Sequence, residues 1–268
     1  MNDSRIAFIG AGNMANSLIL GLIAKGVPAT NIAACDIDQT RLDVLRQVCG
    51  ITTGSMAEVA SQADVVVLAV KPQVLADVCS TLSPLLPANT LVISIAAGIP
   101  LSSLERWLGA DRAVVRCMPN TPALVLEGAT GLFANSNTST TQKKLAEDIL
   151  SAVGISRWLA SEHDINAVTA LSGSGPAYYF LLMEAMEEAA ITMGLEPEMA
   201  RALTIQTALG AAKLAASSDV PPSELRRRVT SPGGTTQAAI ESFEHDGFRD
   251  LVSRALQAAQ KRSVELAG

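Results

Sequence analysis

The stretch Arg5-Ile-Ala-Phe-Ile-Gly-Ala-Gly-Asn-Met-Ala15 decides the fold of this 268-residue chain. It predicts a buried strand that runs into Gly10-x-Gly12-x-x-Ala15 and then into a helix with an apolar period. Gly10 allows the tight turn, Gly12 lets the backbone approach a pyrophosphate, and Ala15 lets the helix pack closely on the strand. Unpaired N–H groups at the helix start would hold the phosphates. The pattern predicts a dinucleotide-binding turn, with a plain strand-turn-helix as the alternative.

The composition is that of a globular chain with a large core, because 49% of the residues are hydrophobic. The length allows two domains of ordinary size. Aromatic residues make up only 3%, which disfavours stacking platforms for bases or sugars. The net charge is −6 without a Lys/Arg tract, so neither nucleic acid nor an anionic membrane is an expected partner. Apolar runs such as Val65–Val70 are too short to cross a bilayer.

The start of the chain and its cysteines predict a cytoplasmic protein. The first strand follows Met1 so closely that we expect no secretory signal. The four cysteines are far apart, with no Cys-x-x-Cys pair, and are expected to be small buried residues of a reduced protein. They are Cys35, Cys49, Cys79 and Cys117.

Strand and helix patterns alternate along the first part of the chain. Such alternation predicts a parallel sheet with helices on both faces, that is, a Rossmann-like, doubly wound α/β domain over residues 1–160. The expected strands are Ile6–Ile9, Ile32–Cys35, Val65–Val70, Leu91–Ile95, Ala113–Cys117, Thr130–Ala134 and Ser156–Leu159. The expected helices are Ser17–Lys25, Gln39–Cys49, Pro72–Leu82, Leu101–Leu108 and Thr140–Val153.

Residues 161–268 are expected to form an all-α domain, because strand signals vanish and long helical patterns take over. The expected helices are Ala177–Met193, Pro197–Ala216, Pro222–Val229, Thr235–Phe243 and Phe248–Leu266. Several faces are Ala-rich and carry little charge, which favours packing against another subunit. A compact bundle within one chain fits the composition equally well.

Three turns follow predicted parallel strands and so fall at the carboxyl edge of the sheet. They contain Lys71-Pro72, Gly98 and Asn120. Ligands of open α/β sheets bind at this edge, so we expect these turns to border one crevice. The alternative is structural, since proline ends strands and begins helices.

Asp36 ends the second strand, 24 residues after Gly12. An acidic residue there usually accepts hydrogen bonds from the adenosine ribose hydroxyls and would repel a 2′-phosphate. The alternative is that Asp36, together with Asp38, caps the helix that begins near Gln39.

Ser231-Pro-Gly-Gly-Thr-Thr236 precedes a helix of the second half. Its unpaired N–H groups and hydroxyls suit a small carboxylate, although an ordinary N-cap is the alternative. The two histidines, His163 and His245, lie among acidic residues, and no metal site can be assembled from them. With no Ser-His-Asp pattern either, the chemistry must need little acid–base help, as hydride transfer from a nicotinamide does.

Six motifs together resemble those of the pyrroline-5-carboxylate reductases. The resemblance implies reduction of 1-pyrroline-5-carboxylate to L-proline by NAD(P)H, the last step of proline biosynthesis. It also implies homodimers interlocked through the helical domain, which assemble further into a decamer. Because of Asp36, we expect NADH to be used well and NADPH not to be strongly preferred. The motifs are Phe8-Ile-Gly-Ala-Gly-Asn-Met14, Ala69-Val-Lys-Pro72, Ala96-Ala-Gly98, Arg116-Cys-Met-Pro-Asn-Thr-Pro122, Leu171-Ser-Gly-Ser-Gly-Pro-Ala-Tyr178 and Val229-Thr-Ser-Pro-Gly-Gly-Thr-Thr236.

The resemblance also implies roles for single residues. Thr236 is expected to be catalytic, with its hydroxyl toward the ring nitrogen of the substrate. Arg228 has an alternative role, because Arg226–Arg228 also fits a solvated helix face. The expected cofactor residues are Gly10, Gly12, Asn13, Met14, Asp36, Ala69, Val70, Lys71, Pro72, Ala97, Gly98 and Asn120, and the expected substrate residues are Glu162, Arg228, Ser231, Gly234, Thr235 and Thr236.

Two rival functions are open to the same architecture. A β-hydroxyacid dehydrogenase needs a lysine in the helical domain, but after residue 160 only Lys213 and Lys261 occur, and neither follows a Gly-rich helix start. A non-catalytic cofactor sensor would keep Gly10 and Gly12 but would not need Ser231–Thr236.

Overall fold

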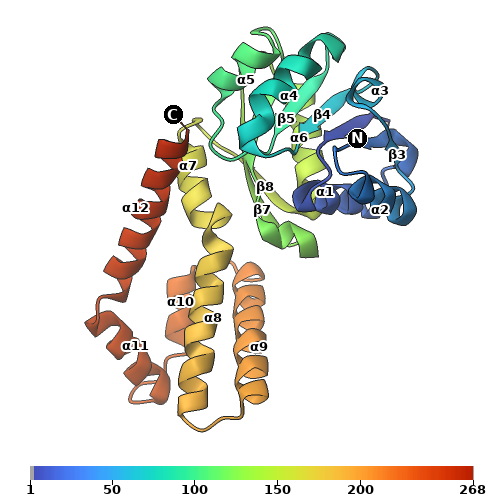
Figure 1. Ribbon diagram of the computed structural model, residues 1–268. Coiled ribbons are helices and arrows are strands. Elements are labelled where there is room, and N and C mark those ends of the chain that lie inside the picture. The colour runs from blue at the N-terminus through green and yellow to red at the C-terminus, as the bar shows by residue number, and fades with distance from the viewer. Residues whose placement is uncertain (1–2, 268) are drawn as a thin grey trace. The chain divides into compact units, whose positions relative to one another are not determined.

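The computed structural model describes residues 3–267 and divides the chain into two compact units (Figure 1). The first unit consists of Met1–Ser174 and Ala259–Gly268, and the second of Gly175–Ala258. The predicted domain boundary after residue 160 stays a prediction. We describe each unit separately.

The first unit contains one eight-stranded sheet with the strand order β3-β2-β1-β4-β5-β6-β7-β8. The predicted doubly wound α/β architecture is therefore confirmed. Its strands are β1 (Ile6–Ile9), β2 (Ile32–Cys35), β3 (Thr52–Thr53), β4 (Val65–Leu68), β5 (Leu91–Ser94), β6 (Val114–Met118), β7 (Gly128–Ala134) and β8 (Gly154–Trp158).

The sheet is mixed, whereas the sequence suggested a parallel one. β7 pairs antiparallel with β6, while the other neighbouring strands pair in parallel. Only residues 119–127 join β6 to β7, and they hold the single short turn η4 (Thr121–Val125). A parallel crossover needs about a dozen residues or more, so this link returns the chain in the opposite direction.

Helices cover both faces of the sheet because alternate side chains of each central strand point to opposite faces. In β1, Phe8 packs into a core with α1 (Asn13–Ala24), α2 (Gln39–Cys49) and α6 (Thr140–Leu150). The next residue, Ile9, packs into a second core with α3 (Met56–Ala60), α4 (Leu75–Leu82) and α5 (Leu101–Leu108). β4 is buried along its whole length, as a central parallel strand must be.

One β-strand and two α-helices in the described part of the first unit are absent from the sequence-based expectation. They are β3, α3 and α7 (Asp164–Val168), each of at most five residues. Elements this short contain too few residues to show a period.

The cysteines of the first unit are free thiols, and three of them are buried as predicted. Burial raises the pKa of Cys35 to about 11 and that of Cys79 to about 12, and it also raises the pKa of Cys117. Cys49 is only half-buried, because it ends α2 at the rim of the core.

The end of the chain returns to the first unit. The hydroxyl of Ser263 donates a 2.9 Å hydrogen bond to the side-chain oxygen of Asn166, and both residues are buried. Asn166 lies on α7, which packs on the sheet so closely that a Cβ at Gly131 would stand 2.9 Å from Val168.

The second unit is helical, as predicted, but it lacks a core of its own. Of residues 175–258, all of which the structure describes, only Gly175, Ala200 and Thr204 are buried. Its helices are α8 (Gly175–Thr192), α9 (Pro197–Ala216), α10 (Pro222–Arg228), α11 (Thr235–His245) and the first part of α12 (Phe248–Leu266) (Figure 1).

Exposed apolar side chains occur on α8, α9 and α12 of this unit. Tyr179, Phe180 and Leu181 are each exposed by 65% or more. So much apolar surface on neighbouring positions marks a protein interface. Of the two interpretations open from the composition, packing against a second copy of the chain is therefore favoured over a self-contained bundle.

Among the described residues, no helix combines the length and the apolar character that crossing a membrane requires.

We expect Leu181→Asp to abolish self-association, because the substitution places a carboxylate in the apolar surface of α8. Light scattering at micromolar concentration measures the change. Val48→Asp is the matched control, since Val48 is an aliphatic residue of α2 that is 69% exposed. A Leu181→Asp protein with the same mass as the wild type would contradict the assignment of this face.

Candidate active site

The turn between β1 and α1 can be built only with glycine at position 10. Gly10 has φ +102°, and a Cβ there would lie 2.8 Å from the carbonyl carbon and oxygen of Ala69. Its N–H donates a 2.8 Å hydrogen bond to the Cys35 carbonyl. The turn is therefore pressed against the ends of both strands that flank β1.

Gly12 is not required by the packing of the turn, because the space where a Cβ would stand is empty. A Cβ at Gly12 would have no heavy atom within 4 Å, and its φ of −73° suits any residue. Gly12 is the N-cap of α1, with no side-chain cap. Among the described residues, no group accepts from the N–H of Asn13 or Met14. These free donors, with the positive end of the helix dipole, have the chemistry that suits an anion.

Asp36 holds the Gly-rich turn in place. Its Oδ2 accepts a 2.6 Å hydrogen bond from the Ala11 N–H, and its Oδ1 accepts a 2.8 Å bond from the Asp38 N–H. Asp38 is the residue that caps α2, because it accepts from the Thr40 N–H. The capping role considered for Asp36 thus belongs to Asp38. An ionised carboxylate has about four acceptor sites, so Asp36 can still accept from ribose hydroxyls.

The turns after β4 and β5 lie beside the Gly-rich turn at the carboxyl edge of the sheet. The Ala69 N–H donates to the Ile9 carbonyl at 2.8 Å, and the Ile95 N–H donates to the Leu68 carbonyl at 3.2 Å. Lys71 and Ala97 are exposed on these turns. Other predicted cofactor residues on these turns, Val70, Pro72 and Gly98, are half-buried.

Asn120 acts as a bridge between chain segments. Its Nδ2 donates to the Ser172 carbonyl at 3.0 Å, and its Oδ1 accepts from the Ala129 N–H at 2.8 Å. The residue is only 9% exposed. These contacts favour the structural alternative for Asn120 over a direct contact with a cofactor.

Glu162 is half-buried and pairs with the buried Arg116, to which the sequence alone assigned no role in the site. Its Oε1 accepts from Arg116 Nη1 and from the Leu101 N–H, both at 2.7 Å. The Arg116 side chain is 5% exposed. The sequence signal that could have revealed the role of Arg116 is its charge within the buried strand β6. Arginine is almost never fully buried unless it is paired.

The second unit contains the other predicted site residues. Gly233 has φ +69°, and Gly234 is the N-cap of α11 without a side-chain cap. Thr235 and Thr236 are exposed in the first turn, and within the described chain their N–H groups have no acceptor. The helix start therefore offers free main-chain donors and hydroxyls to an anion.

Arg228 is held on the surface of α10 by Glu224, at 2.9 Å. Arg227 binds the same carboxylate at 2.7 Å, and hydrogen bonds from Arg227 and then Arg228 lower the pKa of Glu224 to about 2. Both guanidinium groups are more than half exposed. These contacts favour the solvated helix face over a substrate contact for Arg228.

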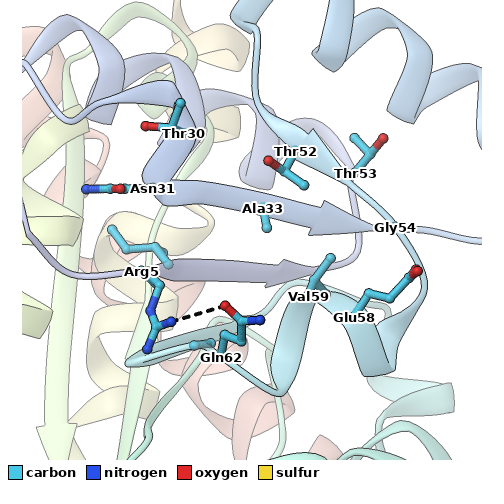
Figure 2. Close-up of a pocket in the computed structure, with 12 residues that line it drawn as sticks. Arg5, Thr30, Asn31, Ala33, Thr52, Thr53, Gly54, Glu58, Val59 and Gln62 are labelled. Carbon is cyan, nitrogen blue, oxygen red and sulfur yellow. Dashed lines mark hydrogen bonds between the residues drawn. The ribbon is translucent and has the colours of Figure 1, made fainter.

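A pocket of about 340 Å³ lies elsewhere on the first unit (Figure 2). Arg5 and Asn31 border it at the amino ends of β1 and β2, and Arg5 Nη1 donates to Gln62 Oε1 at 3.2 Å. No predicted cofactor or substrate residue lines it. Among the described residues, no three His, Cys, Asp or Glu side chains gather where a metal ion could bind.

Comparison with known proteins identifies the family. Residues 162–266 match the family model described as pyrroline-5-carboxylate reductase dimerisation. The pyrroline-5-carboxylate reductase of Pseudomonas aeruginosa is 58% identical over 268 residues, which cover 100% of this chain and 98% of that protein. The chain belongs to the pyrroline-5-carboxylate reductase family. The predicted resemblance is confirmed, and the dehydrogenase and sensor alternatives no longer apply.

Other comparisons agree with this assignment. Residues 5–98 match the model described as NADP oxidoreductase, coenzyme F420-dependent. A pyrroline-5-carboxylate reductase structure from Coxiella burnetii is 47% identical with a TM-score of 0.97, and each chain covers 100% of the other. The Plasmodium falciparum enzyme, solved with NADP bound, is 31% identical with a TM-score of 0.87, again over 100% of both chains.

We expect Gly10→Ala and Gly12→Ala to separate folding from cofactor binding. Gly12→Ala should melt within a few degrees of the wild type but bind NADH at least about tenfold more weakly, because its Cβ enters the space of the pyrophosphate. Gly10→Ala should lose both binding and thermal stability, because its Cβ meets the backbone of Ala69, directly after β4. Thermal melting and fluorescence titration with NADH measure the two effects. Normal NADH affinity in Gly12→Ala would show that the pyrophosphate binds elsewhere.

Proposed function

We propose that this chain reduces 1-pyrroline-5-carboxylate to L-proline in the cytoplasm, as the last step of proline biosynthesis. The main structural support is the uncapped start of α1, where Gly12 and the free N–H groups of Asn13 and Met14 suit a dinucleotide pyrophosphate. Membership of the family supports the choice of substrate. A bound NAD(P)H supplies the hydride, and the protein supplies binding and orientation.

In this proposal the first unit binds the cofactor along the carboxyl edge of its sheet. Gly10, Gly12, Asn13 and Met14 surround the pyrophosphate. The turns after β4 and β5 line the nicotinamide ribose and ring. Their residues are Ala69, Val70, Lys71, Pro72, Ala97 and Gly98. Asn120 supports this edge through its bridge to Ser172 and Ala129.

We propose that NADH is used well and that NADPH is not strongly preferred. The support is Asp36, whose carboxylate already accepts from the Gly-rich turn and retains free acceptor sites for ribose hydroxyls. A 2′-phosphate beside this carboxylate would be repelled by about 1 kcal/mol or more near the protein surface.

The substrate is a cyclic imine that carries one carboxylate. The start of α11 supplies the receptor for it, with main-chain N–H groups of Thr235 and Thr236 after the N-cap Gly234. The Thr236 hydroxyl then points at the ring nitrogen, where it orients the imine and shares the proton as the nitrogen becomes an amine. Ser231 shapes the loop, because its carbonyl accepts from the Gly234 N–H at 3.0 Å.

The active assembly in this proposal is at least a homodimer. The match to the dimerisation model and the coreless second unit support the dimer. We extend the proposal to a decamer of such dimers, which light scattering of the native protein tests.

An absorbance assay with 1-pyrroline-5-carboxylate tests the proposal directly. NADH and NADPH are each oxidised in separate reactions, and 3-hydroxyisobutyrate is run in the oxidative direction beside them. We expect imine-dependent oxidation of the nicotinamide and no reaction with the hydroxy acid. The reverse result would overturn the proposed function.

Asp36→Ser should shift the ratio of kcat/KM values toward NADPH, because the substitution removes the negative charge that opposes a 2′-phosphate. The expected shift is about tenfold or more, which corresponds to about 1.4 kcal/mol. Asp38→Ser is the matched control, since serine also caps helices and the preference should stay unchanged. A wild type that prefers NADPH a hundredfold would rule out the ribose role of Asp36.

Thr236→Ala should lower kcat about 10- to 100-fold, because the reacting nitrogen loses an oriented polar group. The affinity for NADH should hardly change, because the cofactor residues belong to the first unit. Thr236→Ser keeps the hydroxyl and should keep most of the activity. Unchanged kcat and KM in Thr236→Ala would remove this loop from the substrate site.

A further inference from the structure

The Arg116–Glu162 pair is unlike the other ion pairs of the described chain. Arg116 is 5% exposed, whereas every other pair joins side chains that are each at least 27% exposed. In addition, Arg116 Nε is buried and has no hydrogen-bond partner among the described residues. Burying a guanidinium in this incompletely paired state is a poor source of stability. We therefore expect this pair to have a function other than stabilising the fold.

Glu162 connects this buried charge to the start of α5. The same oxygen that binds Arg116 accepts the N–H of Leu101, the first residue of α5. The N-cap, Pro100, makes no side-chain cap bond, so Glu162 takes the place of a local cap. A carboxylate at this end of a helix is also favoured by the helix dipole. Glu162 thus fixes the point at which the loop 95–100 enters α5.

The other parts of this loop are also held. The Ile95 N–H is bonded to the Leu68 carbonyl at the end of β4. Gly98 has φ +75°, and a Cβ there would lie 3.1 Å from the Leu266 carbonyl oxygen at the end of α12. The loop therefore has a backbone bond at its start, a close neighbour in its middle and the Glu162 carboxylate at its end.

We propose that Arg116 and Glu162 are positioning residues, which hold the loop 95–100 where Ala97 and Gly98 meet the nicotinamide ring. This inference rests on the proposed function for the site of that loop. Arg116 fixes the Glu162 carboxylate, and Glu162 fixes the loop. It assigns Glu162 a role different from the substrate contact that the resemblance implied.

The proposal predicts a selective kinetic defect. Glu162→Gln keeps an oxygen for the Leu101 N–H but removes the charge that binds Arg116. The loop then shifts, and kcat for the imine falls about tenfold because hydride transfer is sensitive to small displacements. The dissociation constant of NADH changes by less than about twofold, because the pyrophosphate is held by α1.

A second pair of variants tests Arg116. Arg116→Met removes the charge and should lower kcat as much as Glu162→Gln does. Arg116→Lys keeps a cation for the Glu162 carboxylate and should restore part of the loss. Asp148→Asn is the control, because it breaks the exposed Lys144–Asp148 pair on α6 and should leave kcat unchanged.

Hydrogen exchange measured by mass spectrometry reports the loop without depending on turnover. In the full-length wild type, we expect NADH to slow the exchange of a peptide that covers 95–104. The slowing should be reduced in Glu162→Gln and Arg116→Met and kept in Asp148→Asn. Because this readout needs no imine, the expected pattern would support the positioning role even if the wild type reduced no pyrroline-5-carboxylate.

Two outcomes would overturn the inference. If NADH does not slow exchange in the wild-type peptide, the loop does not meet the cofactor. If Glu162→Gln and Arg116→Met melt at lower temperature while kcat and the NADH-dependent slowing match those of the wild type, the pair is only structural.

Discussion

The close approach of the Gly10 turn to the end of β4 is the constraint on which the rest of the structure depends. The backbone of Ala69 lies where a Cβ of residue 10 would stand, so β1 can pass into α1 only through glycine. Asp36 then secures the same turn from β2 through the Ala11 N–H. With the turn fixed from both sides, the start of α1 keeps its N–H groups free toward a phosphate.

The two units differ in how much apolar surface they bury. The first buries its sheet between two layers of helices and provides a rigid edge for the cofactor. The second buries only Gly175, Ala200 and Thr204 among its residues, so it presents most of its apolar side chains at the surface. Residues 162–266 match the dimerisation model of the family, in agreement with this difference.

Much of the fold follows from local patterns, and the candidate site follows in part. The helices α2, α5, α9 and α12 have the predicted bounds, because each begins and ends at recognisable residues. The roles of Gly10 and Gly12 also follow from a short stretch of sequence, the Gly-rich turn. The roles of Asn120 and Glu162 could not be predicted in this way, because an amide or carboxylate in a sequence does not show which buried groups surround it.

The sequence by itself determined the alternation of strands and helices, the Gly-rich turn and the family, because these depend on periodicity and on short motifs. Only the tertiary structure decided the antiparallel course of β7, the return of the chain end to the first unit and the pairing of the buried Arg116 with Glu162. The direction of β7 follows from the short link between β6 and β7, which is too short for a parallel crossover. For the other two features the physical reason is separation along the chain, because their bonds join residues 46 apart in Arg116–Glu162 and 97 apart in Ser263–Asn166. Such contacts form only when the packed sheet brings distant segments together.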